Sequence, residues 1–164
     1  MQVEIKNVKY AAFASEETSC FEATVYIDGK RVGTVGNDGH GGCHRWHPHT
    51  LQTALDDHAK ATLPPETMEW DDPNTPGQKF VLHPDGEMVV NSLLDDFLLR
   101  RDLTRILAKK VAYVGTDDKL YTTKALDKAR LALVLTKPEQ FKNAKVILNT
   151  LPFDEAAALY RAHG

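Results

Sequence analysis

The fold is decided by the stretch Phe21-Glu22-Ala23-Thr24-Val25-Tyr26-Ile27-Asp28-Gly29-Lys30. Its apolar residues at 21, 23, 25 and 27 alternate with mostly polar ones, a period typical of a strand with one buried face. The Asp28-Gly29 pair predicts a tight hairpin turn, because both central residues of a type I′ turn need a positive φ. With apolar residues at 3–8 before this stretch and at 32–35 after it, the sequence predicts a three-stranded antiparallel meander over residues 2–36.

Further along the chain, hairpin signals alternate with helical periodicity, and no βαβ pattern is present, so we expect the α+β class. The longest predicted helix carries apolar residues on opposite sides at its two ends, which predicts a central helix buried on both sides. The predicted elements are helices at 50–62, 91–110, 126–134 and 152–162, hairpins at 79–90 and 111–123, and a last short strand at 146–148.

Composition places the chain among globular proteins. It has 164 residues, of which 42% are hydrophobic and 26% charged, and no apolar run approaches the roughly 18 residues of a membrane span. The two cysteines are too few for a disulfide framework, which favours a cytoplasmic protein. We expect segments 1–62 and 79–164, joined by a Pro-rich acidic loop at 63–78, to form one compact domain or two tightly packed subdomains.

Charge is segregated along the chain although the total is only −3. Residues 1–62 have a formal net charge of −2, residues 63–98 of −7, and residues 99–164 of +6. The acidic and basic segments either neutralise each other within the molecule or form two patches that meet different partners. The basic third lacks interleaved aromatic residues, so a nucleic-acid partner is not expected, and a gel shift at two salt concentrations would test one.

A cluster of possible metal ligands follows the meander in the Gly-rich stretch 37–49. Zinc needs three or four His, Cys or carboxylate ligands on a tetrahedron, and glycines let a loop wrap around a metal. His58 or His83 could complete such a site, but a His-rich surface loop gives the same pattern. The predicted zinc ligands, for a structural site or a metal-dependent hydrolase, are His40, Cys43, His44, His47 and His49.

Other catalytic chemistry has weaker support in the sequence. The glycines at 39–42 lack the Lys-Ser/Thr of a phosphate-binding loop. Cys43 stands beside His44 in the sequence, but adjacency alone does not make a nucleophile–base pair. Because no catalytic constellation is complete, no catalytic residue is assigned and the sequence leans against an enzyme.

Two tryptophan-containing loops suggest protein binding instead. Arg and Trp are the residue types that most often anchor protein interfaces. Both tryptophans could equally pack under their own loops as lids on the core. The predicted partner-binding residues are Arg45, Trp46, Trp70, Asp71 and Asp72.

The stretch from Ser15 to Lys30, together with Asn37-Asp38-Gly39-His40-Gly41-Gly42, resembles small uncharacterised proteins encoded by tailed phages and prophages. The resemblance covers about the first 45 residues, and that group supplies no catalytic residues. It implies a bacterial cytoplasm as the setting, where small acidic phage proteins often inhibit host machinery, including CRISPR effectors. We therefore expect an accessory protein that binds a host or phage protein, with zinc binding as the alternative.

Overall fold

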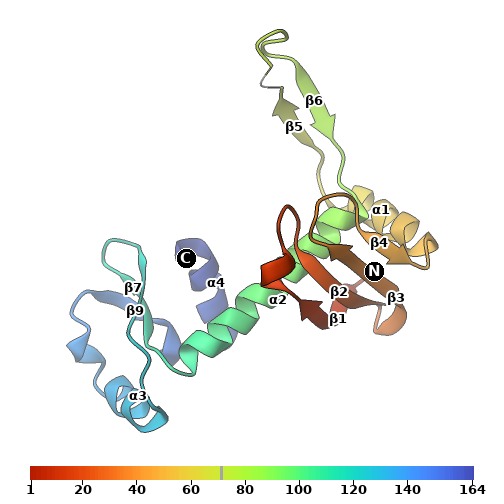
Figure 1. Cartoon of the computed structure of the whole chain (residues 1–164). Helices are drawn as coiled ribbons and strands as arrows, with labels where there is room; N and C mark the ends of the chain where they lie inside the picture. Colours follow the sequence, from red (N-terminus) through yellow and green to blue (C-terminus); the bar gives the residue numbers. More distant parts are fainter. Residues whose placement is uncertain (71) are drawn as a thin grey trace. The chain divides into compact units, whose positions relative to one another are not determined.

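The computed structural model describes residues 1–70 and 72–164 (Figure 1). The chain divides into unit 1, Met1–Leu94, and unit 2, Asp95–Gly164. Helix α2 (Gly86–Leu107) begins in unit 1 and ends in unit 2. The predicted α+β class, with an N-terminal antiparallel meander and one long helix, is confirmed. In the described part of the chain, no helix is both long enough and apolar enough to span a bilayer.

Unit 1 is built on a four-stranded antiparallel sheet. Its strands are β1 (Val3–Tyr10), β2 (Cys20–Ile27), β3 (Lys30–Asp38) and β4 (Arg45–His47), in the order β1-β2-β3-β4. The β2–β3 turn has positive φ at Asp28 and Gly29, as the sequence predicts. Strand β4 extends the meander by three residues that the sequence assigned to a loop.

The core of unit 1 lies on one face of this sheet. Phe21, Val25 and Val35 are buried there, as the alternation predicts, and helix α1 (Thr50–Thr62) buries Leu51 and Leu55. The start of α2 approaches α1 so closely that a Cβ at Gly86 would lie 2.8 Å from the Leu55 Cβ. Glycine at this position therefore lets the two helices meet.

The predicted hairpin at 79–90 is wrong. Strand β6 (Lys79–Leu82) pairs with β5 (Glu66–Glu69), and residues 86–90 form the first turn of α2. The predicted Pro-rich loop at 63–78 thus holds one strand and the turn of a hairpin, which follows α1 and leads into α2 within unit 1 (Figure 1).

Unit 2 contains a three-stranded antiparallel sheet with helices packed against it. The predicted hairpin at 111–123 and the last strand are confirmed, and helix α4 buries Ala156 and Ala157 against Leu103 of α2 and Val114. Helix α3 buries Leu131 in a second cluster with Val111 and Ile147. The elements are β7 (Ala112–Gly115), β8 (Leu120–Thr122), β9 (Ala144–Ile147), α3 (Lys128–Leu135) and α4 (Phe153–His163), with 3₁₀ turns η2 (Pro138–Gln140) and η3 (Leu148–Thr150).

Candidate functional site

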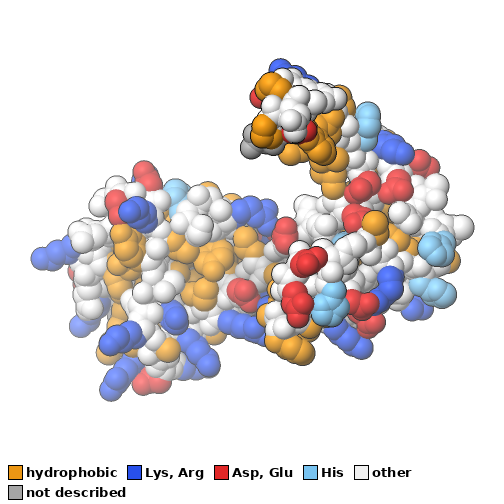
Figure 2. All heavy atoms as spheres, turned by 45° about the horizontal axis from the view of Figure 1, so that its top comes forward, with side chains coloured by type: hydrophobic (Ala, Val, Ile, Leu, Met, Phe, Trp, Pro, Cys, Tyr) orange, Lys and Arg blue, Asp and Glu red, His pale blue; other side chains and the backbone are white. Residues whose placement is uncertain are grey.

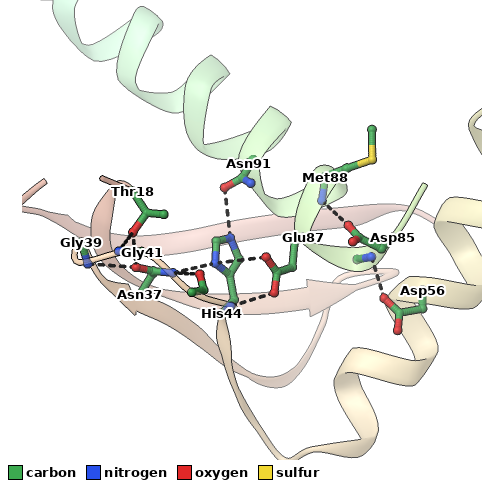
Figure 3. Close-up of polar contacts among 12 residues, drawn as sticks. Thr18, Asn37, Gly39, Gly41, His44, Asp56, Asp85, Glu87, Met88 and Asn91 are labelled. Carbon is green, nitrogen blue, oxygen red and sulfur yellow. Dashed lines mark hydrogen bonds and ion pairs between the residues drawn. The ribbon is translucent and has the colours of Figure 1, made fainter. Parts of the chain in front are cut away.

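His44 lies inside unit 1, at the centre of a polar network (Figure 3). Its Nε2 is 3.0 Å from Asn91 Oδ1 and its Nδ1 is 3.3 Å from Asn37 Nδ2. A neutral imidazole fits both contacts, since Nε2–H donates to the Asn91 oxygen and Nδ1 accepts from the Asn37 amide. The backbone N–H of His44 donates to Glu87 Oε1 at 2.8 Å. The Nε2 atom and the backbone N–H of His44 therefore hold the loop to α2, while Nδ1 holds it to Asn37 in β3.

The other predicted zinc ligands are exposed, whereas His44 is buried. His40 is exposed and pairs with Glu16, with 3.3 Å between Nδ1 and Oε2, and Cys43 is exposed. His47 and His49 are also exposed, His47 because it alternates with buried Trp46 along β4. Within residues 1–70 and 72–164, no three His, Cys, Asp or Glu side chains are placed to hold a metal ion. The structure thus does not bring together the five side chains that the sequence suggested.

Asn37 extends the network to a second loop. Its Oδ1 accepts from the Thr18 hydroxyl and from the Gly39 N–H, and its Nδ2 donates to the Gly42 carbonyl (Figure 3). The Gly39 carbonyl in turn accepts from the N–H groups of Glu16 and Glu17. A Cβ at Gly39 would lie 2.0 Å from the Ala14 carbonyl oxygen, and the φ of Gly39 is +86°. Only glycine fits there, so the Gly-rich stretch fixes loop 11–19.

Loop 11–19 carries Phe13, the most exposed large hydrophobic side chain among the described residues. Phe13 lies in the 3₁₀ turn η1 (Ala12–Ala14) and is 93% exposed. Ser15 closes the loop, because its hydroxyl donates to the Ala11 carbonyl and accepts from the Cys20 N–H. Sequence reasoning missed Phe13. The sequence does contain a signal: Phe13 is a large apolar residue among alanines, in the connection between two strands. It belongs to no alternating or helical pattern of apolar residues, as a core residue would.

Two of the predicted partner-binding residues, Arg45 and Trp46, are adjacent in β4 but differ in burial. Trp46 is only 5% exposed and belongs to the core, so the lid interpretation is correct for this tryptophan. Its Nε1 is buried without a hydrogen-bond acceptor among the described residues. Arg45 is exposed and forms an ion pair with Asp38, whose hydrogen bond raises the pKa of the guanidinium.

Trp70 instead belongs to an exposed apolar surface on the β5–β6 hairpin. The register pairs Met68 with Phe80 and Glu66 with Leu82, so these side chains share one face of the hairpin. Trp70 continues that face past the end of β5, with its ring centroid 5.5 Å from that of Phe80. We call this surface the hairpin face; it consists of Met68 (45% exposed), Trp70 (55%), Phe80 (37%) and Leu82 (41%).

The opposite side of the same hairpin is mixed. Thr67 pairs with Val81 there, and Glu69 with Lys79, whose charged atoms are 3.9 Å apart. The two faces thus differ in chemistry although every residue of both strands is exposed. Figure 2 shows hydrophobic side chains gathered along the hairpin.

Asp72 organises the turn that presents Trp70. Its carboxylate accepts hydrogen bonds from the backbone and side chain of Asn74 and from the Thr75 hydroxyl. The backbone bond from Asn74 is the main reason why the pKa of Asp72 lies below its usual range. Asp72 therefore shapes the turn through its own hydrogen bonds. Asp71, the remaining predicted partner-binding residue, lies outside the described residues.

An open groove of about 530 Å³ lies on the outer face of the unit 1 sheet. Glu22 is its single carboxylate, and it lies across the strands from Lys9. A single acid among Lys, Arg and Thr side chains does not form the pair of carboxylates that general acid–base catalysis often uses. The groove therefore supplies no catalytic assignment.

Comparisons of this chain with protein-family models, with curated proteins and with solved structures found no match.

Proposed function

We propose that the protein acts by binding another protein, and that the hairpin face is its main contact surface. The observation that carries this proposal is the exposure of four large apolar side chains on one face of a two-stranded hairpin. Contiguous exposed apolar patches mark interaction sites, because leaving them in water costs free energy that a partner surface recovers.

The construction of the hairpin supports this role. An isolated two-stranded hairpin is at best marginally stable in water, so two strands with an exposed apolar face gain stability when a partner covers them. Trp70 adds the residue type that most often dominates binding energy, and its edge contact with Phe80 restrains both rings before binding. Phe13, held by the Asn37 network, is a second anchor of the same kind.

The N-terminal resemblance to phage and prophage proteins suggests the partner. In that setting we propose a host protein of the bacterial cytoplasm, and inhibition of a defence enzyme such as a CRISPR effector by occlusion of its surface. The acidic charge of residues 63–98 would then speed association with a basic surface.

The test compares proteins captured from a bacterial host lysate by three forms of the purified protein. These are the natural chain, the double variant Trp70→Ser with Phe80→Ser, and the control Val81→Ser. Val81 suits as a control because it is 51% exposed on the opposite side of β6. We expect a host protein that is captured by the natural chain and by Val81→Ser, and at least tenfold less by the double variant.

Equal capture by all three forms would contradict the hairpin face as the contact surface. Capture lost in all variants alike would point to a general effect on folding, which circular dichroism of each variant resolves.

A further inference from the structure

A second apolar surface lies on helix α3 of unit 2. This helix buries Leu131 against the sheet, and a surface helix usually carries polar residues on its other side. Here the exposed side carries Ala129, Ala132 and Leu133, and Leu133 is 60% exposed. Spacings of three and four residues place these side chains on one stripe of the helix. We call this stripe the α3 face.

The two faces are complementary in charge. Residues 63–82, which include the hairpin, contain four Asp or Glu and one Lys, a net charge of −3. Residues 124–139, which include α3, contain four Lys or Arg and two Asp or Glu, a net charge of +2, and Arg130 is paired with Asp127 at 3.5 Å. An acid-rimmed apolar surface and a base-rimmed one attract each other and repel copies of themselves. This disfavours pairing of two hairpin faces.

The two faces also match in size. Eight helical residues extend for about 12 Å at 1.5 Å per residue. Strands of four residues extend for about 13 Å at 3.3 Å per residue. Packing of a helix on an apolar sheet face is one of the standard ways in which such surfaces become buried.

We propose that the hairpin face of one copy of this chain binds the α3 face of a second copy. Each chain carries one face of each kind, so two copies that bind reciprocally form the contact twice. Forming the contact twice matters because specific interfaces bury roughly 1,200–2,000 Å² in total, and each face has only a few side chains. The inference rests on the proposed function, since it names a partner for the same hairpin face.

Sedimentation velocity of the purified protein at micromolar concentrations, in 50 mM and in 1 M NaCl, tests this proposal. We expect twice the mass of one chain at low salt, with at least a tenfold rise in the dimer dissociation constant at high salt, where charges are screened beyond about 3 Å. Trp70→Ser and Leu133→Asp should each give a monomer, whereas Val81→Ser should remain a dimer.

A mixture of the two monomeric variants provides the decisive measurement. Trp70→Ser retains an intact α3 face and Leu133→Asp retains an intact hairpin face, so the mixture can form one of the two contacts. We expect mixed dimers, with a dissociation constant weaker than that of the natural chain. A monomer at every concentration, or a dimer that Leu133→Asp does not weaken, would overturn the proposal. If the chain is monomeric but the hairpin variant still loses its host partner, only this inference fails and the proposed function stands.

Discussion

At position 44, an imidazole fills a place that suits a neutral, hydrogen-bonded side chain. One ring nitrogen donates to Asn91 and the other accepts from Asn37, so a proton on Nδ1 would face the Asn37 amide donor. The role of His44 is thus to join the Gly-rich loop to the start of α2.

Replacing His44 should therefore destabilise the fold. His44→Ala removes both ring contacts and leaves one N–H of the buried Asn37 amide without an acceptor, so we expect a loss of about 2–3 kcal/mol in the free energy of unfolding. The control is His47→Ala, which removes an exposed ring from the same segment and should change the value by less than about 0.5 kcal/mol. Urea unfolding measures both, and similar losses in the two variants would refute this role.

Trp46 should behave as a core residue with a poorly satisfied polar atom. Trp46→Phe removes the buried N–H together with part of the ring, so two opposing effects nearly cancel and we expect a change below about 1.5 kcal/mol. Trp46→Ala should cost about 3–5 kcal/mol through the cavity that it leaves. Thermal and urea unfolding of both variants measure this, and a negligible cost of Trp46→Ala would show that the side chain is not part of the core.

At the level of single residues, the sequence predicts partner binding through both tryptophans and does not distinguish the exposed Trp70 from the buried Trp46. Trp46 is buried because it belongs to strand β4. This strand has only three residues and follows a run of glycines, so its alternation of exposed and buried residues is hard to recognise in the sequence. Once β4 pairs with β3, Trp46 lies opposite Val35 and shares its buried face. Phe13 was missed because the fit of Gly39 beneath loop 11–19 is a tertiary contact that no local pattern records.

At the scale of elements, the sequence predicts that β6 pairs with residues 87–90, whereas in the structure it pairs with β5. Residues 87–90 have the β-branched composition of a strand, but Asp85 accepts from the Met88 N–H and Asp56 from the Gly86 N–H (Figure 3). These two carboxylates satisfy donors at the start of α2, where a helix lacks partners for its first N–H groups. Burial of Val90 and Leu94 then favours the helix, and β6 pairs with β5 instead. Capping and packing at the start of α2 thus outweigh the strand propensity of residues 87–90.

In unit 2, helices α2 and α4 are joined by an ionic network. Asp96 accepts hydrogen bonds from Arg100 and Arg161, and Arg100 also donates to Asp154. Partial burial by itself raises the pKa of Asp96, but the hydrogen bonds and charges of the two arginines outweigh it and lower the pKa. Since the folded-state pKa is depressed, the stabilisation is present above the ordinary Asp pKa of about 3.9 and is lost as pH falls through the folded value.

This network predicts how stability depends on acid. Asp96→Asn should lower the melting temperature near neutral pH and should reduce the further loss between pH 5 and pH 2, because one proton-linked contact is gone. Asp154→Asn is the control, because the Asp154 side chain is 85% exposed whereas that of Asp96 is 38% exposed. Melting curves across this pH range check the expectation, and an unchanged acid dependence in Asp96→Asn would contradict it.

For the molecule as a whole, charge divides with the two units. Unit 1 carries 7 Lys or Arg and 14 Asp or Glu, and unit 2 carries 13 and 9, so their formal net charges are −7 and +4. This difference in net charge can be predicted from the sequence, because formal charges are counted without knowledge of the fold. Which apolar side chains stay exposed beside those charges depends on tertiary packing, and of the hairpin face the sequence predicts only Trp70 as a partner-binding residue.

We propose above all that the hairpin face binds a protein. Photo-crosslinking in bacterial host cells tests it most directly, with Phe80→p-benzoylphenylalanine compared with the same replacement at Phe153. Both phenylalanines are 37% exposed, so access to solvent is matched. We predict a covalent adduct with a second polypeptide at position 80, several-fold stronger than at position 153. Equal yields at the two positions, or no adduct at position 80, would contradict the account.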